Sequence, residues 1–209
     1  MIRSCLYTIV LLLFSSCLSL KTNSLSTSNI LGNQDVVPSQ AKPQEPLQDV
    51  TQYTFPYLSA FNNNRLNFSA NQIRELENIL ELNIEPEDDL NLLFEAASWI
   101  GTPYKHAGNT RDGVDCSGLT AAIYKNVYST ILDRRSDGQF TFNCYKISTN
   151  ELKSGDLVFF KINSNKISHV GIYLKNNKFL HASLYRGVVV NDLTESYYKK
   201  YFYSAGRVK

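Results

Sequence analysis

The stretch SHVGIYLKNNKFLHASL, residues 168–184, decides the fold. Apolar residues alternate with other residues through both of its halves, and the asparagines between them are typical of a turn, so the stretch predicts a β-hairpin. One face of this hairpin is aliphatic and carries Val170, Ile172, Leu174, Leu180, Ala182 and Leu184. The opposite face carries His169, Gly171, Tyr173, Phe179, His181 and Ser183. Because the aliphatic face has to be buried, its pattern fixes the register of the pairing.

This register predicts that His169 and His181 lie on one face of the sheet. An odd-length loop or a β-bulge within residues 175–178 would make the two side chains direct or diagonal neighbours. Adjacent histidines are seldom needed for folding, whereas one of them can act as a general base while the other orients it. The alternative is a pair of half-exposed strand histidines without a function.

The segment GVDCSGL, residues 113–119, offers a nucleophile for such a base. Asp115 is a good N-cap, which places Cys116 in the first turn of a helix, where unpaired N–H groups and the helix dipole favour a thiolate. One alternative is a small buried residue at the start of a core helix. Another is a zinc site built from Cys116, His169, His181 and Asp115, although the sequence has no short pair of ligands.

The sequence around the hairpin predicts helices first and strands afterwards. A helix over residues 69–82 begins at the cap Ser69, an amphipathic helix follows over residues 90–101, and a third begins at Cys116. We interpret the first helix as packing on the main domain; a partner-binding helix is the alternative. Further strands are predicted over residues 156–160, 187–193 and 204–209. Helices followed by an antiparallel meander indicate the α+β class.

The N-terminal residues 1–16 are interpreted as a lipoprotein signal peptide. One basic residue precedes an apolar run that is too short to span a bilayer. The run ends in LFSSC, which resembles the lipobox of bacterial lipoproteins and implies that Cys17 carries a lipid, although Phe14 stands where leucine is usual. The alternatives are plain secretion after cleavage near Ser16 and an uncleaved anchor. The mature chain would then keep Cys116 and Cys144, which could pair in an exported protein.

The rest of the chain divides by composition. Residues 17–52, which follow the signal peptide, are rich in Ser, Thr, Asn, Gln and Pro and predict a disordered tether behind the lipidated cysteine. Residues 53–88 are interpreted as a helical extension, and residues 89–209 as the main domain. A net charge of +2, with no run of Lys or Arg, excludes nucleic acid as an expected partner.

Four blocks of the main domain together resemble a known family. GTPYKHAGNTRDGVDCSGL (101–119), GDLVFF (155–160), SHVGIYL (168–174) and FLHAS (179–183) resemble the NlpC family of bacterial cell-wall cysteine peptidases, over about residues 90–209. The resemblance implies a small papain-like α+β domain. It also implies hydrolysis of peptidoglycan stem peptides between D-γ-glutamate and a diamino acid, without a metal or a cofactor.

The resemblance implies roles for particular residues. Cys116 matches the nucleophile, His169 the general base, and His181 the polar residue that orients the base. Tyr104 matches the tyrosine of the family's PY block in the oxyanion region, where a phenol would donate a hydrogen bond to developing charge. A packed aromatic without such a role is the alternative for Tyr104. Cys144 lies outside every matching block and is interpreted as an inert, packed thiol.

Further positions are implied to bind substrate. Asp115 and Ser117 match positions that contact the amine and the D-glutamate of the stem peptide. Arg134 and Gln139 resemble a groove-lining stretch, although Asp133 replaces its usual proline. His106 and Ala107 also depart from the family, which often has an aromatic residue and a glycine there.

The expected setting is the cell envelope. Residues 18–88 are too polar and irregular for a bacterial SH3-like wall-binding module, so residence near the wall would depend on the lipid on Cys17. Leu18 after that cysteine favours the outer membrane in some two-membrane bacteria. The alternatives to a peptidase are a related papain-like amidase or acyltransferase, and a wall-binding scaffold lipoprotein with little activity.

Overall fold

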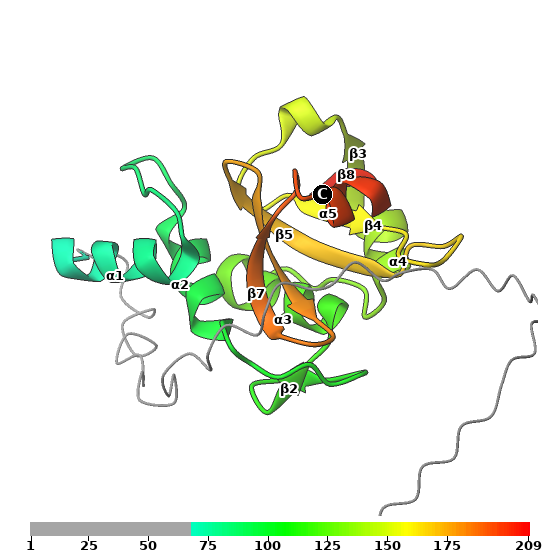
Figure 1. The fold of residues 1–209 in the computed structure, drawn as a ribbon, viewed down its shortest axis with the longest axis horizontal. Helices are drawn as coiled ribbons and strands as arrows, with labels where there is room; N and C mark the ends of the chain where they lie inside the picture. Colours follow the sequence, from blue (N-terminus) through cyan, green and yellow to red (C-terminus); the bar gives the residue numbers. More distant parts are fainter. Residues whose placement is uncertain (1–67) are drawn as a thin grey trace, which may run out of the picture. The chain divides into compact units, whose positions relative to one another are not determined.

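The computed structural model describes residues 68–209. The predicted signal peptide, the lipidation at Cys17, the tether and the start of the helical extension lie outside the described residues. Within residues 68–209, three helices come first in the chain and a six-stranded antiparallel sheet follows (Figure 1). This arrangement confirms the predicted α+β class.

The longer helices begin close to where the sequence predicts them. They are α1 (Ala70–Leu80), α2 (Leu90–Trp99) and α3 (Cys116–Tyr128). The sequence did not predict the shorter turns that follow. These are α4 (Ser136–Gly138), a π-helical turn η3 (Gln139–Asn143), a 3₁₀ turn η4 (Thr149–Glu151) and α5 (Ser196–Tyr201).

The main sheet has the strand order β3-β8-β4-β5-β6-β7. Its strands are β3 (Cys144–Ile147), β4 (Leu157–Phe160), β5 (His169–Lys175), β6 (Lys178–Ser183), β7 (Gly187–Asp192) and β8 (Phe202–Val208). The short pair β1 (Asn109–Thr110) and β2 (Gly113–Val114) forms a separate ladder. The sequence missed β3 because that strand has exposed residues at Tyr145 and Lys146, which hides any alternation.

The hairpin of β5 and β6 has the register that its aliphatic face demanded. Ile172 pairs with Leu180 and Tyr173 pairs with Phe179, and the register shifts between Tyr173 and Lys175. This irregularity is the bulge expected near the turn. The assignment of Leu184 to the buried face was wrong: β6 ends at Ser183, and Leu184 is 63% exposed beyond the strand.

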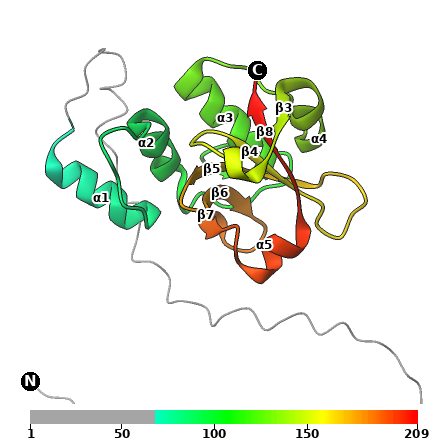
Figure 2. The same ribbon diagram turned by 90° about the horizontal axis from the view of Figure 1, so that it is seen from above.

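Helix α1 packs on the main domain, as the sequence predicted. The hydroxyl of the N-cap Ser69 accepts a hydrogen bond from the Gln72 backbone N–H, and the Gln72 side-chain oxygen accepts one from the Ser69 backbone N–H, which forms a capping box. Leu76 and Leu80 are buried in the same cluster as the core of the domain. Figure 2 shows α1 and α2 together at one end of the domain, opposite α4 and β3.

Helix α2 is not amphipathic in the way its sequence suggested. It is buried on nearly every side because it lies between α1 and α3. Even Glu95 is buried. Its carboxylate accepts hydrogen bonds from the side chains of Trp99 and Asn126, each at 2.8 Å, and forms an ion pair with Arg111 at 3.2 Å. A buried carboxylate is tolerated there because three donors, one of them a guanidinium, converge on its Oε1.

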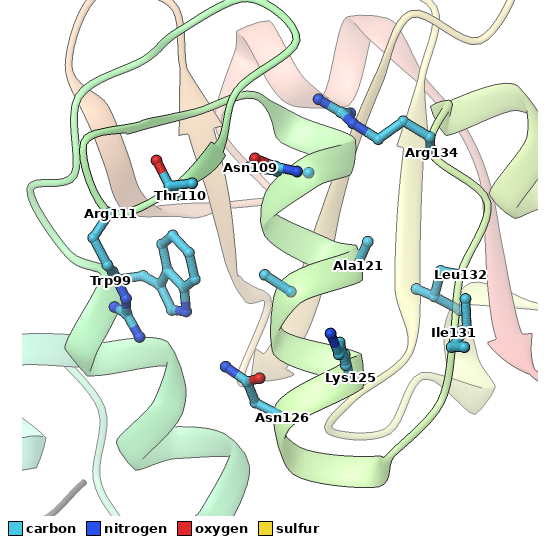
Figure 3. Close-up of a pocket in the computed structure, with 12 residues that line it drawn as sticks. Trp99, Asn109, Thr110, Arg111, Ala121, Lys125, Asn126, Ile131, Leu132 and Arg134 are labelled. Carbon is cyan, nitrogen blue, oxygen red and sulfur yellow. The ribbon is translucent and has the colours of Figure 1, made fainter.

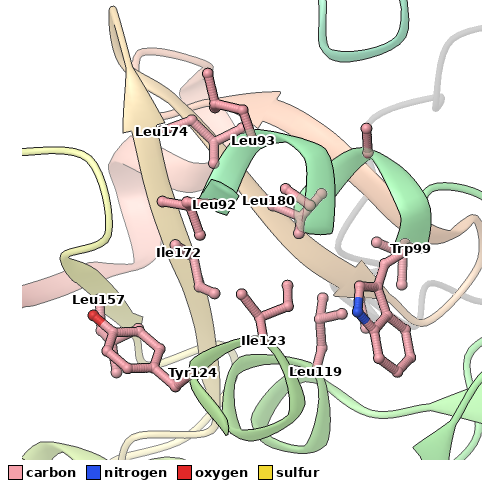
Figure 4. Close-up of a cluster of buried hydrophobic side chains, with 14 of the residues drawn as sticks. Leu92, Leu93, Trp99, Leu119, Ile123, Tyr124, Leu157, Ile172, Leu174 and Leu180 are labelled. Carbon is pink, nitrogen blue, oxygen red and sulfur yellow. The ribbon is translucent and has the colours of Figure 1, made fainter. Parts of the chain in front are cut away.

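Helix α3 is held against the sheet by a continuous apolar cluster. Leu119 and Ile123 of α3 and Ile172 and Leu180 of β5 and β6 all belong to it (Figure 4). A smaller cluster lies on the opposite face of the sheet and contains Val158, Phe160, Phe179 and Tyr198. The position of α3 therefore follows from burial of the aliphatic face of the hairpin.

Among residues 68–209, no helix is both long and apolar enough to cross a membrane.

Gly171 allows β5 and β6 to approach each other closely. A Cβ atom there would lie 2.7 Å from the Phe179 ring and 2.8 Å from the Leu180 carbonyl oxygen. Because Phe179 is fully buried and cannot move aside, we expect Gly171→Ala to lower the free energy of unfolding by about 1–3 kcal/mol. Urea denaturation measures this effect, and Ser183→Ala on β6 is the control, expected to change stability by no more than about 0.5 kcal/mol. An unchanged midpoint for Gly171→Ala would contradict the close approach.

Candidate active site

The loop before α3 brings its first turn into the site. Asp115 is the N-cap, and its carboxylate accepts a hydrogen bond from the Gly118 N–H at 2.7 Å. A Cβ atom on Gly118 would lie 2.3 Å from the Gly108 carbonyl oxygen, so only glycine lets the helix approach the preceding loop this closely. The predicted N-cap is confirmed, and Cys116 opens the helix.

The Cys116 thiol faces β5 at the residue that follows His169. Its side chain is nearly buried, at 8% exposure, and burial raises the thiol pKa to about 11. The backbone N–H of Val170 lowers the pKa, the Asp115 carboxylate raises it, and the N–H groups of Ser117 and Cys116 lower it again. The N–H groups at the helix N-terminus lower the thiol pKa, as the sequence predicted, yet the thiol stays protonated at rest. The N–H groups do act on the sulfur, but the loss of hydration outweighs them.

His169 and His181 meet as the hairpin register predicted. His169 Nε2 lies 3.0 Å from His181 Nδ1, and the two rings stand nearly perpendicular, at 86°. His181 is 2% exposed and stacks on Phe179, while Phe160 lies beside His169. The alternative of independent, half-exposed histidines is thus contradicted for His181, which is buried and bound to His169.

Both imidazoles are neutral at neutral pH. Burial lowers the pKa of His169 well below its ordinary value, and the neighbouring His181 lowers it further. Burial also lowers the pKa of His181 to about 4, with a hydrogen bond to Asn191 acting in the opposite direction. At rest, the thiol of Cys116 is therefore protonated and both imidazoles are neutral.

Sequence reasoning missed the groups behind His181. His181 Nε2 lies 3.0 Å from Asn191 Oδ1 on β7 and 3.1 Å from the Tyr198 hydroxyl on α5. Asn191 and Tyr198 are both buried. The only signal for Asn191 was an amide at the end of the apolar run of residues 188–190, and Tyr198 lies in a helix that the sequence did not predict.

Arg134 joins Asp115 and Ser117 in one hydrogen-bonded group at the start of α3. Arg134 donates to both carboxylate oxygens of Asp115 at 2.8 Å, to Ser117 Oγ at 3.1 Å and to the Gly108 carbonyl at 3.0 Å. Burial pushes the Asp115 pKa upward, but the hydrogen bonds from Arg134 and Gly118 outweigh it and leave the pKa below its ordinary value. Asp115 is therefore a carboxylate at neutral pH.

Gln139 does not line a groove, contrary to the expectation. It is 0% exposed, and its amide donates to the backbone carbonyls of Ser117 at 3.0 Å and Asp133 at 2.9 Å. Its oxygen accepts from the Thr120 hydroxyl at 2.8 Å. Gln139 thus joins the first turns of α3 to the loop that carries Arg134, because its amide satisfies both segments from the interior.

The phenol of Tyr104 lies within electrostatic range of the Cys116 thiol. Burial raises the pKa of its phenol, and the nearby Cys116 and Asp115 raise it further. The phenol therefore keeps its proton and remains a hydrogen-bond donor at neutral pH. Close by, Ala107 adopts a left-handed conformation at φ 58°, which explains why the family often has glycine there.

A cavity of about 490 Å³ adjoins the site along the outer face of α3. It shares Gly118 and Arg134 with the site but is not lined by Cys116, His169 or His181. In Figure 3, Arg134 lies near one end of the cavity and Asn126 near the other. The cavity is therefore a neighbour of the candidate active site and not the site itself.

The two cysteines of the described residues do not form a disulfide. Cys116 and Cys144 are both free and buried, so the alternative of a disulfide between them is not realised. Cys144 is the packed thiol that the sequence predicted. Between residues 68 and 209, no cluster of three or more His, Cys, Asp or Glu side chains could hold a metal ion.

Alkylation of Cys116 is expected to be slow at neutral pH. With the thiol pKa at about 11, the thiolate fraction and the rate with iodoacetamide should rise about tenfold for each pH unit between 7 and 10. Peptide mass spectrometry measures labelling at Cys116, and the chain unfolded in urea provides the control, in which the rate levels off near pH 8.5 to about 9. A folded protein that reacts at pH 7 as fast as the unfolded chain would contradict a buried, protonated thiol.

The neutral His181 ring makes the fold sensitive to acid. Its pKa falls from 6.5 to about 4 on folding, so the unfolded chain takes up the proton first. The neutral ring contributes on the order of 3 kcal/mol to the free energy of unfolding. This contribution is complete above about pH 6.5 and is lost as the pH falls towards 4. Urea denaturation at pH 7 and 4.5 should show a smaller acid-induced loss in His181→Gln than in wild type. His106→Gln, at an exposed position, should keep the full loss. Equal losses in all three proteins would refute a neutral His181.

Comparison with known proteins agrees with this geometry. The family model described as the NlpC/P60 family matches residues 101–207. The chain is 43% identical over 112 residues to the probable endopeptidase NlpC of Escherichia coli, which covers 53% of this chain and 72% of that protein. It is 34% identical over 134 residues to the murein DD-endopeptidase MepS/murein LD-carboxypeptidase of Escherichia coli. That match covers 64% of this chain and 69% of the relative.

Solved structures give the same assignment. An NLP/P60 family protein from Staphylococcus aureus, described as similar to lipoprotein, matches with a TM-score of 0.53 and 31% identity over 61% of this chain and 43% of that one. An NlpC/P60 family protein from Bacillus cereus matches with a TM-score of 0.52 and 29% identity over 56% and 39%. The matched part spans less than half of either solved chain. From the extent of the sequence match, together with the fold, the chain belongs to the NlpC/P60 family.

Proposed function

We propose that the protein is a cell-wall hydrolase, a cysteine endopeptidase that cuts peptidoglycan stem peptides between D-γ-glutamate and the diamino acid. The relatives named probable endopeptidase NlpC and murein DD-endopeptidase support a peptidase of the cell wall. The proposal is carried by the first turn of α3, which presents the Cys116 thiol to the β5 backbone at Val170, the residue that follows His169 of the His169–His181 pair. The bond between D-γ-glutamate and the diamino acid rests on the family resemblance.

The proposed reaction begins with transfer of the thiol proton from Cys116 to His169. The sulfur then attacks the carbonyl carbon of the substrate, and the oxygen takes up negative charge. Tyr104 stabilises this charge, because its phenol still carries a proton at neutral pH. When the C–N bond breaks, the proton on His169 passes to the leaving amine. Water, deprotonated by His169, then hydrolyses the thioester and restores the thiol.

Substrate recognition is proposed for the ion pair of Asp115 and Arg134 with Ser117. Asp115 is ionised at neutral pH and can bind the free amine of a stem peptide. The Arg134 side chain is 41% exposed, so its guanidinium can also reach a carboxylate of the substrate. Gln139 has no direct role here, because it is buried and supports the two segments that carry these groups.

We further propose that the protein acts in the cell envelope through a lipid on Cys17. The lipobox-like sequence and the polar segment after it support a tethered domain with access to the wall. A lipid at this position would place the domain near its polymer without a separate binding module. The outer membrane is the proposed location where the organism has one.

A wall-binding protein with little activity is the second candidate. The observation that favours it is the buried thiol, whose pKa of about 11 leaves few thiolates at neutral pH. A related papain-like amidase or acyltransferase would use the same groups, and analysis of the products separates it from a peptidase.

Replacement of the nucleophile tests the proposal. Digestion of defined muropeptides containing diaminopimelate or lysine, followed by mass spectrometry, should show fragments with the full-length protein in detergent. We expect Cys116→Ala to lower the rate by at least about 10⁴-fold, because covalent catalysis needs the sulfur. Cys144→Ala, at the other buried thiol, is the matched control and should retain activity. Fragments released at an undiminished rate by Cys116→Ala would refute a cysteine peptidase.

A further inference from the structure

The groups that surround Asn191 form a polar cluster behind the histidine pair. Asn191 Oδ1 accepts a hydrogen bond from Arg186 Nη2 at 2.6 Å, and Asn191 Nδ2 donates to Glu195 Oε1 at 2.8 Å. His181 Nε2 lies 3.0 Å from the same oxygen of Asn191. Asn191 is buried, whereas Glu195 lies at the exposed start of α5. The proposed reaction assigns no role to Asn191, Arg186 or Glu195.

These contacts fix which way the Asn191 amide faces. The NH₂ group must point to Glu195, because a carboxylate only accepts hydrogen bonds, and the oxygen must point to Arg186, because a guanidinium only donates them. A flipped amide would set its oxygen against the Glu195 carboxylate and its NH₂ against the Arg186 guanidinium. The side of Asn191 that faces His181 is therefore an acceptor.

An acceptor at this position determines the tautomer of each histidine. His181 Nε2 must carry the proton in order to donate to Asn191 Oδ1, so the lone pair of the neutral ring lies on Nδ1. Because His181 Nδ1 then accepts, His169 Nε2 at 3.0 Å must be the donor. A neutral His169 that carries its proton on Nε2 has its lone pair on Nδ1. Both rings are neutral near pH 7 because burial lowers the pKa of each.

We propose that Glu195 and Arg186, acting through Asn191 and His181, are positioning residues that keep the lone pair of His169 on Nδ1, the nitrogen that accepts the Cys116 proton. The assignment of that proton transfer rests on the proposed function. The tautomer assignment itself follows from the side-chain contacts among His169, His181 and Asn191. The cluster extends the site from β5 and β6 to β7 and α5.

Tyr198 fits the same assignment. Its hydroxyl donates to Asn191 Oδ1 at 3.2 Å, and its oxygen lies 3.1 Å from His181 Nε2, where it can accept a share of the same N–H. Tyr198 alone does not select the tautomer, because a hydroxyl can either donate or accept. We therefore expect the amide of Asn191 to be decisive and the phenol to be secondary.

Nitrogen-15 NMR of the ligand-free, full-length protein at pH 7 tests the tautomers directly. We expect His169 and His181 each to be protonated at Nε2 and unprotonated at Nδ1. In Asn191→Leu, which keeps the size of the side chain but removes the acceptor, both tautomers should become populated. A proton on Nδ1 of either histidine in the wild type would overturn the proposal, whether or not any variant folds.

Kinetics on defined muropeptides separates positioning from binding. We expect Asn191→Leu to lower kcat by about 10- to 100-fold with KM within about twofold, as for other residues that orient a catalytic side chain. Glu195→Ala should lower kcat in the same direction, and Tyr198→Phe by no more than about threefold. Glu87→Gln removes a surface carboxylate far from the cluster in sequence and is the control, with no change expected.

A rescue distinguishes the tautomer from general damage to the fold. The double variant Asn191→Asp, Glu195→Gln exchanges the acid and the amide. A carboxylate oxygen at position 191 then faces His181, and the amide at position 195 donates to the carboxylate at position 191. We expect it to recover kcat to within about threefold of wild type and to restore the single tautomers. Recovery of neither property would contradict the proposal. If no variant or wild-type protein cuts muropeptides while the NMR shows Nε2 protonation, the proposed function fails and the tautomer assignment stands.

Discussion

The packing of the first turn of α3 against β5 is the contact on which the candidate site depends. It sets the Cys116 thiol against the backbone N–H of Val170, the residue after His169. Burial of the aliphatic face of the hairpin drives this contact, because Leu119, Ile123, Ile172 and Leu180 belong to one cluster. The same register that buries these side chains also brings His169 and His181 into contact, so folding energy and site geometry have a common cause.

Burial also sets the protonation states of the site. Loss of hydration raises the thiol pKa to about 11 and lowers the pKa values of both histidines, so the resting groups are all neutral. A thiolate–imidazolium pair would have to form during the reaction, when substrate charge and dipoles replace water. The N–H groups at the start of α3 already point to the sulfur and need no rearrangement at that moment.

Polar support reaches the site from two directions. On one side Gln139 holds the start of α3 and the loop of Arg134 together, and Arg134 then binds both oxygens of Asp115. On the other side Asn191 joins β7 and α5 to His181. The donors and acceptors of each buried amide are satisfied by groups on different elements or loops, which restricts the rotamers of the side chains that they hold.

The sequence by itself determined the hairpin register, the N-cap at Asp115 and the neighbourhood of His169 and His181, because alternation and capping are local rules. The family resemblance also singled out Asp115, Ser117 and Arg134 as substrate contacts, but not the hydrogen bonds that join them. Only the tertiary structure decided that α2 is buried all round, that Gln139 supports rather than lines the site, and that the thiol is protonated at rest. These properties depend on how much water the neighbouring elements exclude. Because several segments far apart in the sequence exclude that water together, no local sequence pattern predicts it.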